Sequence, residues 1–391
     1  MPPLTQKVAA LADELVPVLA GHAADVDREA RFPVESMTAI RESDLMGLLV
    51  PERYGGLGGD LSALGAVAGR LASGCLSTAM IWAMHCQQVD TIARYGTPEL
   101  RDALLPRIAG GEVYVASVTT EQGKGGHLLT ASAPLVPRGD RLAFDRMAPV
   151  VTGGLHADGY LITMREHETA QPQRVSLVYA ERDQVTVTQL GGWHALGMRG
   201  TESVPLRIAG EVPSTQLVGE AGGFRTAAVE SFVPAGHIGW AACWLGAARG
   251  AFADLVAVLR SGNRPATVDP RSDLVAERLA RARMSLELVS AYLGRVVEDV
   301  DRARADGTSL EPAATQIHLN LLKVIGAELT YDAVERLVNL VGMRLGYLTG
   351  AQVPLERHLR DLRSASLNYA NDRLLVATGT LAWLDRAIDL A

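Results

Sequence analysis

A polar segment close to residue 391 contains residue types that could do chemistry. RDLRSASLNYANDR, residues 360–373, interrupts a stretch with helical leucine spacing and brings Asn368 next to Tyr369. A phenol can donate or accept a proton, and an amide can orient a polar ligand. By residue type alone, the segment suits a helix cap, an interface or the wall of an active site.

A second candidate region combines hydroxyl groups with glycines. VASVTTEQGKGG, residues 115–126, joins a run of strand-like residues to a glycine-rich turn. Thr120, together with Thr152 on a later strand-like run, would offer hydroxyl groups at strand ends. Gly123, Gly125 and Gly126 would let the backbone approach a ligand closely. Each of these features, taken alone, is more often structural than functional.

Composition limits the class of protein. The chain has 391 residues, 48% of them hydrophobic, and a formal net charge of -7, which is typical of a folded protein with two or three substructures. Its basic residues are dispersed, so we expect no nucleic-acid partner. Three cysteines without a CxxC or a paired-histidine spacing predict neither a disulfide framework nor a metal site. The sequence has no secretory signal and no uninterrupted apolar run of about 18 residues, so we expect a cytoplasmic protein with no membrane partner.

The spacing of apolar residues changes twice along the chain. It is helical in the first part, alternates in short runs broken by glycine, proline and charged turns in the middle, and becomes helical again after residue 220. This pattern predicts an α+β protein with an N-terminal helical domain (1–112), a central small β-barrel or sandwich (113–220) and a C-terminal four-helix bundle (221–391).

Five stretches, in the same order along the chain, resemble the acyl-CoA dehydrogenase superfamily. They are YGTPELRDALLPRIAGGE (95–112), VASVTTEQGKGG (115–126), VVTGGLHADGYLI (150–162), WHALGMRGTESVPLRIAGEVP (193–213) and PLERHLRDLR (354–363). Each motif is weak by itself, but the ordered set spans nearly the whole chain. The resemblance therefore implies an acyl-CoA dehydrogenase-like fold.

The resemblance also implies a cofactor and partners. We expect FAD, an acyl thioester substrate on CoA or an acyl carrier protein, an electron-transfer partner or O2, and a homo-oligomer, either a dimer or a homotetramer. Arg260 would meet the FAD pyrophosphate of a neighbouring subunit, and residues 337–348 would run along the dinucleotide. The implied cofactor-binding residues are Val118, Thr119, Thr120, Gly125, Gly126, Val150, Thr152, Arg260, Asn339, Gly342, Met343 and Asn371.

The resemblance fails where the family keeps its catalytic base. Acyl-CoA dehydrogenases remove a proton next to the thioester with a glutamate, whose pKa can rise in a dry pocket. Tyr369 stands at one of the family's two glutamate positions, and an ungapped count puts Gly236 at the other. Val150 also replaces an aromatic residue that stacks on the flavin, and Gly126–His127 replaces a Ser-Asp pair.

Three hypotheses follow from this departure. In the first, the enzyme oxidises an unusual acyl thioester, and Tyr369, Glu230, Asp372 or His237 takes the proton. In the second, it is a flavin-dependent monooxygenase of the same fold, in which His85 and Asn368 stand where such enzymes have histidines near the ring. In the third, the protein only binds a flavin or an acyl carrier.

The sequence favours the first hypothesis, an FAD-dependent oxidoreductase of specialised metabolism. Tyr369, His85 and Asn368 are the predicted catalytic residues, and the segment 360–373 is predicted to form the wall of the active site.

Overall fold

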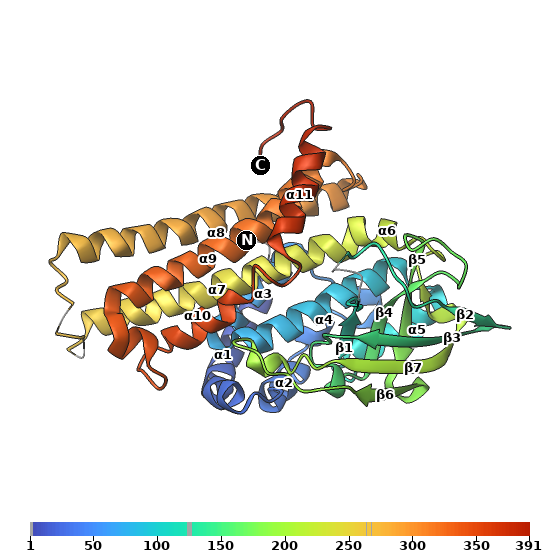
Figure 1. The fold of residues 1–391 in the computed structure, drawn as a ribbon, viewed down its shortest axis with the longest axis horizontal. Coiled ribbons are helices and arrows are strands. Elements are labelled where there is room, and N and C mark those ends of the chain that lie inside the picture. The colour runs from blue at the N-terminus through green and yellow to red at the C-terminus, as the bar shows by residue number, and fades with distance from the viewer. Residues whose placement is uncertain (1–2, 123–126, 263, 267) are drawn as a thin grey trace.

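The chain folds into three successive parts that pack on one another. The computed structural model describes residues 3–391 except 123–126, 263 and 267. Figure 1 shows long helices at one end of the molecule and two β-sheets at the other end. The N-terminal helices lie beneath the long helices. This order confirms the predicted α+β architecture.

The N-terminal part consists of helices that pack on the central bundle. Two of them have side-chain caps: Asp60 accepts a hydrogen bond from the Ala63 amide at 2.7 Å, and Thr97 accepts one from the Leu100 amide at 3.2 Å. The helices are α1 (Pro3–Glu29), α2 (Val34–Arg41), α3 (Leu61–Gly74), α4 (Leu76–Tyr95) and α5 (Pro98–Ala109).

The central part is a sandwich of two four-stranded sheets, as predicted. One sheet has the order β1-β4-β5-β8 and the other the order β2-β3-β7-β6. In the first sheet, β1 pairs in parallel with β4, and Val115 lies opposite Gly159. The strands are β1 (Val115–Val118), β2 (Val136–Arg138), β3 (Arg141–Ala148), β4 (Gly159–Arg165), β5 (Val175–Glu181), β6 (Val185–Gln189), β7 (Leu206–Pro213) and β8 (Leu217–Val218).

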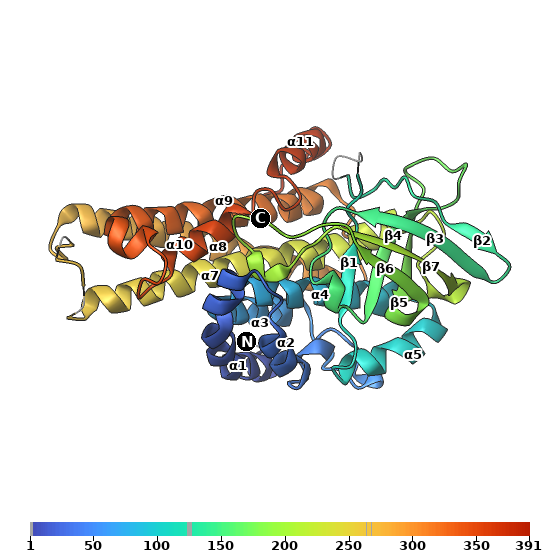
Figure 2. The same ribbon diagram turned by 60° about the horizontal axis from the view of Figure 1, so that its bottom comes forward.

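The C-terminal part is a helical bundle built around α7. Figures 1 and 2 both show α7 between the pair α8–α9 and the N-terminal helices. The bundle contains α6 (Phe224–Ala227), a π-helical turn (Ala228–Phe232), α7 (Val233–Arg260), α8 (Asp273–Asp306), α9 (Ala313–Gly342), a second π-helical turn (Met343–Tyr347), α10 (Leu355–Arg363) and α11 (Asn371–Ala382). Short 3-10 turns elsewhere are Leu45–Gly47, Glu52–Tyr54, Gly154–His156, Arg182–Gln184, Arg199–Thr201 and Ser214–Gln216.

Burial explains the composition of α7. The continuous helical stretch Phe224–Arg260 is long and apolar enough to cross a membrane, but 61% of its most apolar window is buried inside the structure. Gly246 allows the close approach of α3, because a Cβ there would lie 2.0 Å from the carbonyl oxygen of Gly69. The stretch is thus the core of the bundle.

Candidate active site

A cavity of about 710 Å³ lies where the three parts of the chain meet. Its walls come from α4, the end of β1, the loop that follows β3, the segment before β7, the beginning of α7 and the turn between α10 and α11. Most of the lining is apolar and includes Met80, Met84, Phe232, Trp240 and Trp244. A cavity of this size can hold a cofactor together with a small substrate.

The strand side of the cavity carries hydroxyl groups. Thr119, Thr120, Val150 and Thr152 all line it. The Thr120 hydroxyl donates to the carbonyl oxygen of Val150 at 2.8 Å and accepts from the Val150 amide at 3.3 Å, so it joins the two strand ends. The hydroxyl of Thr152 lies 3.1 Å from that of Ser203.

The helical side of the cavity includes the polar turn singled out from the sequence. Asn368 and Tyr369 both line the cavity. Tyr369 has a left-handed backbone conformation, with φ of 55°, which is unfavourable for a bulky residue. The segment predicted to form an active-site wall therefore lies at a cavity.

His237 contributes an imidazole to the same wall. Its Nδ1 lies 3.0 Å from the carbonyl oxygen of Leu319 in α9. Because a carbonyl oxygen can only accept, Nδ1 carries the proton and Nε2 holds a lone pair. Nε2 has no hydrogen-bond partner within the described part of the chain. Burial, with a smaller contribution from the nearby Lys323, lowers the pKa of His237 to about 3, so the ring is neutral at pH 7.

His85 differs from His237 both in its hydrogen bonds and in its position relative to the cavity. Its Nε2 donates to the carbonyl oxygen of Met46 at 3.1 Å, and its Nδ1 accepts from the Val115 amide at 3.1 Å. The side chain is fully buried and does not line the cavity. The structure therefore does not bring His85 to the site as the sequence predicted, because α4 turns it toward β1, where both ring nitrogens join backbone groups.

No carboxylate lines the cavity among the described residues, and residues 123–126 (Gly-Lys-Gly-Gly) contain no acid. Glu121 follows the strand wall, but it pairs with the buried Arg146 at 2.8 Å and accepts from the amides of Ser132 and Ala133. Asp361 accepts from the Met198 amide at 2.5 Å. Glu121 and Asp361, which are next to lining residues in sequence, thus have other partners.

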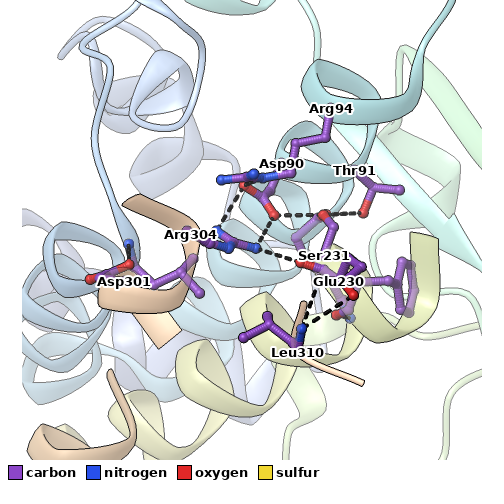
Figure 3. Close-up of polar contacts among 11 residues, drawn as sticks. Asp90, Thr91, Arg94, Glu230, Ser231, Asp301, Arg304 and Leu310 are labelled. Carbon is purple, nitrogen blue, oxygen red and sulfur yellow. Dashed lines mark hydrogen bonds and ion pairs between the residues drawn. The ribbon is translucent and has the colours of Figure 1, made fainter. Parts of the chain in front are cut away.

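The acids proposed from the sequence as alternative bases also lie elsewhere. Glu230 accepts hydrogen bonds from the hydroxyl of Ser309 at 2.5 Å and from the amide of Leu310, so it holds the α8–α9 connection (Figure 3). Asp372 is exposed and does not line the cavity. Neither carboxylate is placed to take a proton from a ligand in the cavity.

The family's second glutamate position is closed by packing. A Cβ at Gly236 would lie 2.3 Å from Nε2 of Gln87. That amide nitrogen donates to the carbonyl oxygen of Phe232 at 2.7 Å, so it cannot move without losing this bond. His237, the next residue along the chain, is the polar group that reaches the cavity from this part of α7.

A cluster of ion pairs and hydrogen bonds lies next to the cavity wall. Asp90 of α4 binds Arg304 of α8 at 2.7 Å and accepts from the hydroxyl of Ser231, which belongs to the π-helical turn (Figure 3). Arg94 pairs with Asp90 at 3.1 Å. Burial alone would raise the pKa of Asp90, but Arg304 and Arg94 lower it below its usual value. These contacts fix the turn whose last residue, Phe232, lines the cavity.

The other predicted cofactor residues are spread over the molecule. Val118 is buried behind the strand wall, and the amide side chain of Asn371 binds Lys323 and Glu328. Gly123, Gly125 and Gly126 lie outside the described residues. Arg260, Asn339, Gly342 and Met343 lie at the ends of α7 and α9, away from the cavity of the same chain (Figure 1). Their predicted contact with a flavin of a neighbouring subunit stays a prediction.

Sequence reasoning missed Lys323, Trp240 and Trp244 as parts of the site. The signal for Lys323 was present, because it is one of three lysines in the chain and stands in the apolar run LNLLKVIG. Trp240 lines the cavity, and its buried Nε1 has no acceptor among the described residues. An indole donor without an acceptor is a group that a ligand can satisfy.

Comparisons with known proteins agree with the motif order. The family model of the acyl-CoA dehydrogenase N-terminal domain matches residues 4–112, and a model of the C-terminal domain matches residues 238–372. The chain belongs to the acyl-CoA dehydrogenase superfamily. It is thus an enzyme of the flavin oxidoreductase class, as predicted.

Proteins similar to this chain differ in the reactions that their names describe. Isobutyryl-CoA dehydrogenase of Dictyostelium discoideum is 27% identical over 89% of this chain and 81% of its own. Butyryl-CoA dehydrogenase of Megasphaera elsdenii superposes with a TM-score of 0.85 at 21% identity, over 98% and 99% of the two chains. Dibenzothiophene monooxygenase of Paenibacillus sp. A11-2 also superposes with a TM-score of 0.85, at 20% identity over 97% and 98%. The fold is therefore common to dehydrogenases and to a monooxygenase.

Proposed function

We propose that this superfamily member is a flavin-dependent monooxygenase that transfers one oxygen atom from O2 to an apolar or aromatic substrate. The observation that carries the proposal is the cavity lining, in which no described residue carries a carboxylate and most of the surface is apolar. The proposal reverses the order that the sequence favoured, because none of the described residues that line the cavity is an acid that could replace the missing glutamate.

The chemistry of His237 argues against removal of a proton from carbon. A base must retain the proton that it removes, and a group with a pKa of about 3 does not do so at neutral pH. Burial also raises the pKa of Tyr369 above its usual value, which keeps the phenol protonated. A neutral imidazole and a neutral phenol suit hydrogen bonding to a polar reagent in an apolar cavity.

The cavity has the volume and the groups to hold a flavin. The hydroxyls of Thr152 and Ser203 on the strand side and the unpaired Nε1 of Trp240 on the helical side can bind polar edges of a ring system. Val150 offers an apolar surface at the end of the strand wall. FAD is the family's cofactor, and FMN is bound in a solved structure of the Paenibacillus monooxygenase.

A reduced flavin supplies activated O2, and the chain's own residues would control where it reacts. Phe232, Trp240 and Trp244 would exclude water and orient an aromatic substrate. Nε2 of His237 would accept a hydrogen bond, and the Tyr369 hydroxyl would donate one. The overall reaction consumes O2, substrate and reduced flavin, and yields oxygenated product, water and oxidised flavin.

Oxidation of an acyl thioester is the second candidate. It is favoured by the curated relatives, such as the Dictyostelium isobutyryl-CoA dehydrogenase at 27% identity. In that reaction Nε2 of His237 would have to take the proton. Electrons would then pass from the flavin to an electron-transfer partner.

One experiment separates the two candidates. The purified protein is loaded with FAD or FMN and tested in two arms. In the first arm, reduced flavin, ¹⁸O2 and indole are supplied, because indole is bound in a solved structure of the Paenibacillus monooxygenase. In the second arm, oxidised flavoprotein is mixed anaerobically with isobutyryl-CoA or butyryl-CoA.

The proposal expects ¹⁸O in an indole-derived product and no loss of flavin colour with either thioester. Rapid anaerobic bleaching by a thioester, without oxygen transfer, would establish the dehydrogenase instead. A protein that binds neither flavin would contradict both candidates.

A further inference from the structure

Lys323 is a buried cation that contacts the wall of the cavity from behind. Its side chain in α9 has no exposed surface. Nζ donates to the carbonyl oxygens of Ala365 and Tyr369, both at 2.9 Å, and to Oδ1 of Asn371 at 2.7 Å. All three hydrogens of an ammonium group are therefore used within one short turn.

Stability alone does not explain this residue. The three acceptors are neutral, and the nearest acid in the network, Glu328, is reached only through the side-chain amide of Asn371, at 3.1 Å. Burial lowers the pKa of Lys323 to about 7, which expresses the cost of keeping a charge there. The ring of Trp244, whose centroid is 5.6 Å from Nζ, compensates part of this cost.

The turn held by Lys323 has a conformation that needs support. The chain leaves α10 at Arg363 and enters α11 at Asn371, and Tyr369 between them has a φ of 55°. A left-handed conformation is unfavourable for a tyrosine and persists only where surrounding contacts enforce it. The bond from Nζ to the carbonyl oxygen of Tyr369 is such a contact.

The same lysine affects both polar groups of the helical wall. Its charge helps to keep His237 neutral, and the rings of His237 and Tyr369 lie 6.3 Å apart. Trp244 lines the cavity with its ring beside Nζ. Lys323 thus contacts the backbone of Tyr369 and the ring of Trp244, and its charge acts on His237.

We propose that Lys323 is a positioning residue of the active site, which holds the turn 365–371 so that Asn368 and Tyr369 face the cavity. This inference rests on the proposed function only because it takes the cavity as the active site. It holds for oxygen transfer and for thioester oxidation alike.

The test uses Lys323→Met, which keeps the length of the side chain and removes its charge and donors. The first readout is hydrogen exchange by mass spectrometry on the protein without flavin, in peptides covering residues 364–372. The amides of Leu367 and Asn368 bond to the carbonyl oxygen of Ser364, and that of Asn371 bonds to Ser366, so they report on the turn. We expect exchange in these peptides to become at least ~10-fold faster, because bonds to a charged group are lost.

Turnover is the second readout, with whichever reaction the wild-type protein catalyses. We expect kcat to fall by about 10-fold in Lys323→Met, as misplacement of polar wall groups predicts. Thr330→Val is the matched control, because Thr330 is also fully buried in α9 and donates only to the carbonyl oxygen of Gly326, at 2.7 Å. The control should keep wild-type exchange in the turn and wild-type kcat.

Unchanged exchange in residues 364–372 of Lys323→Met would overturn the inference. If this variant does not fold, Asn371→Ala provides the same test, since it removes one acceptor of Nζ and the link to Glu328. Exchange in the turn should then rise several-fold, and unchanged exchange would again contradict the inference. Failure of the proposed function would give a different result. The wild-type protein would then transfer no oxygen, but its turn would still exchange hydrogen slowly.

Discussion

Two buried polar clusters lie in the helical part of the molecule, and they are built differently. The Asp90 cluster contains Asp90, Arg94, Ser231 and Arg304, and its carboxylate faces two arginines (Figure 3). The Lys323 cluster contains Lys323, Asn371, Tyr369 and His237. Its cation faces only carbonyl and amide oxygens, and its imidazole remains neutral.

The difference separates a group that stabilises the fold from a group that shapes a site. A buried charge with opposite charges beside it compensates its own desolvation, whereas a buried lysine on neutral acceptors does so less completely. A buried charge that has no opposite charge beside it, and that lies next to a large cavity, is typical of a functional site. We therefore expect mutations in the first cluster to change stability and mutations in the second to change turnover.

The largest expected effect is on the Asp90 cluster. Asp90→Ala leaves Arg304 buried without its partner, and we expect the free energy of unfolding to fall by about 3–5 kcal/mol. Urea unfolding followed by circular dichroism measures this. At a temperature where the variant is folded, its kcat should stay within about two-fold of wild type. A loss under about 1 kcal/mol would mean that the Asp90–Arg304 ion pair contributes little to the free energy of unfolding.

The next effect concerns His237. In His237→Asn the amide can still donate toward the carbonyl oxygen of Leu319, but the Nε2 lone pair is gone. We expect kcat to fall by more than about 10-fold, because a buried hydrogen-bond acceptor is lost and not replaced. Steady-state kinetics with the substrate of the wild-type enzyme measures it. His85→Asn, at a histidine outside the cavity, is the comparison, and it should lower stability more than kcat.

Acid should destabilise the protein through its buried histidines. The folded-state pKa values of His85, His237 and His358 are lowered by burial, to about 4, about 3 and about 3. Between these values and about 6.5, the unfolded chain binds protons that the folded chain does not, so stability present above pH 6.5 is lost as the pH falls. From pH 7.5 to pH 6 we expect a loss of about 2 kcal/mol. Equal urea midpoints at the two pH values would contradict this.

The smallest expected effect belongs to Tyr369. If its hydroxyl only donates a hydrogen bond, as the proposed oxygen transfer requires, Tyr369→Phe should lower kcat by about 10-fold. A loss of about 10²-fold or more would instead indicate that the phenol transfers a proton. Stability should hardly change, because the backbone carbonyl bound by Lys323 is kept. Kinetics and thermal unfolding of the same preparation give both quantities.

The order of helical and alternating periods predicted the three-part fold correctly. The strand-like runs of the sequence, residues 113–120, 141–153, 158–166, 174–181 and 185–190, became β1, β3, β4, β5 and β6. No comparable pattern marks β2, β7 and β8: β2 has only three residues with Pro137 at its centre, β7 is interrupted by Gly210, and β8 has only two residues. Their pairing partners in the sheets, rather than their own patterns, make them strands.

The candidate site was predictable in part. The hydroxyl wall at Thr119 to Thr152 and the polar turn at Asn368–Tyr369 both line the cavity. The prediction for His85 was wrong in its placement, because a histidine in an apolar helix looks the same in sequence whether it faces a strand or a cavity. Lys323 was missed because its acceptors lie more than forty residues further along the chain.

The sequence by itself determined the periodicity of each part, the ordered family motifs and the absence of an acid at both glutamate positions. Those properties depend on residue identity and on neighbours close along the chain. Tertiary structure alone decided which histidine has a free nitrogen and whether a distant carboxylate fills the gap. The physical reason is that the protonation and availability of a buried group depend on its hydrogen-bond partners. For His237 that partner is the carbonyl oxygen of Leu319, 82 residues away, which only folding brings within 3.0 Å.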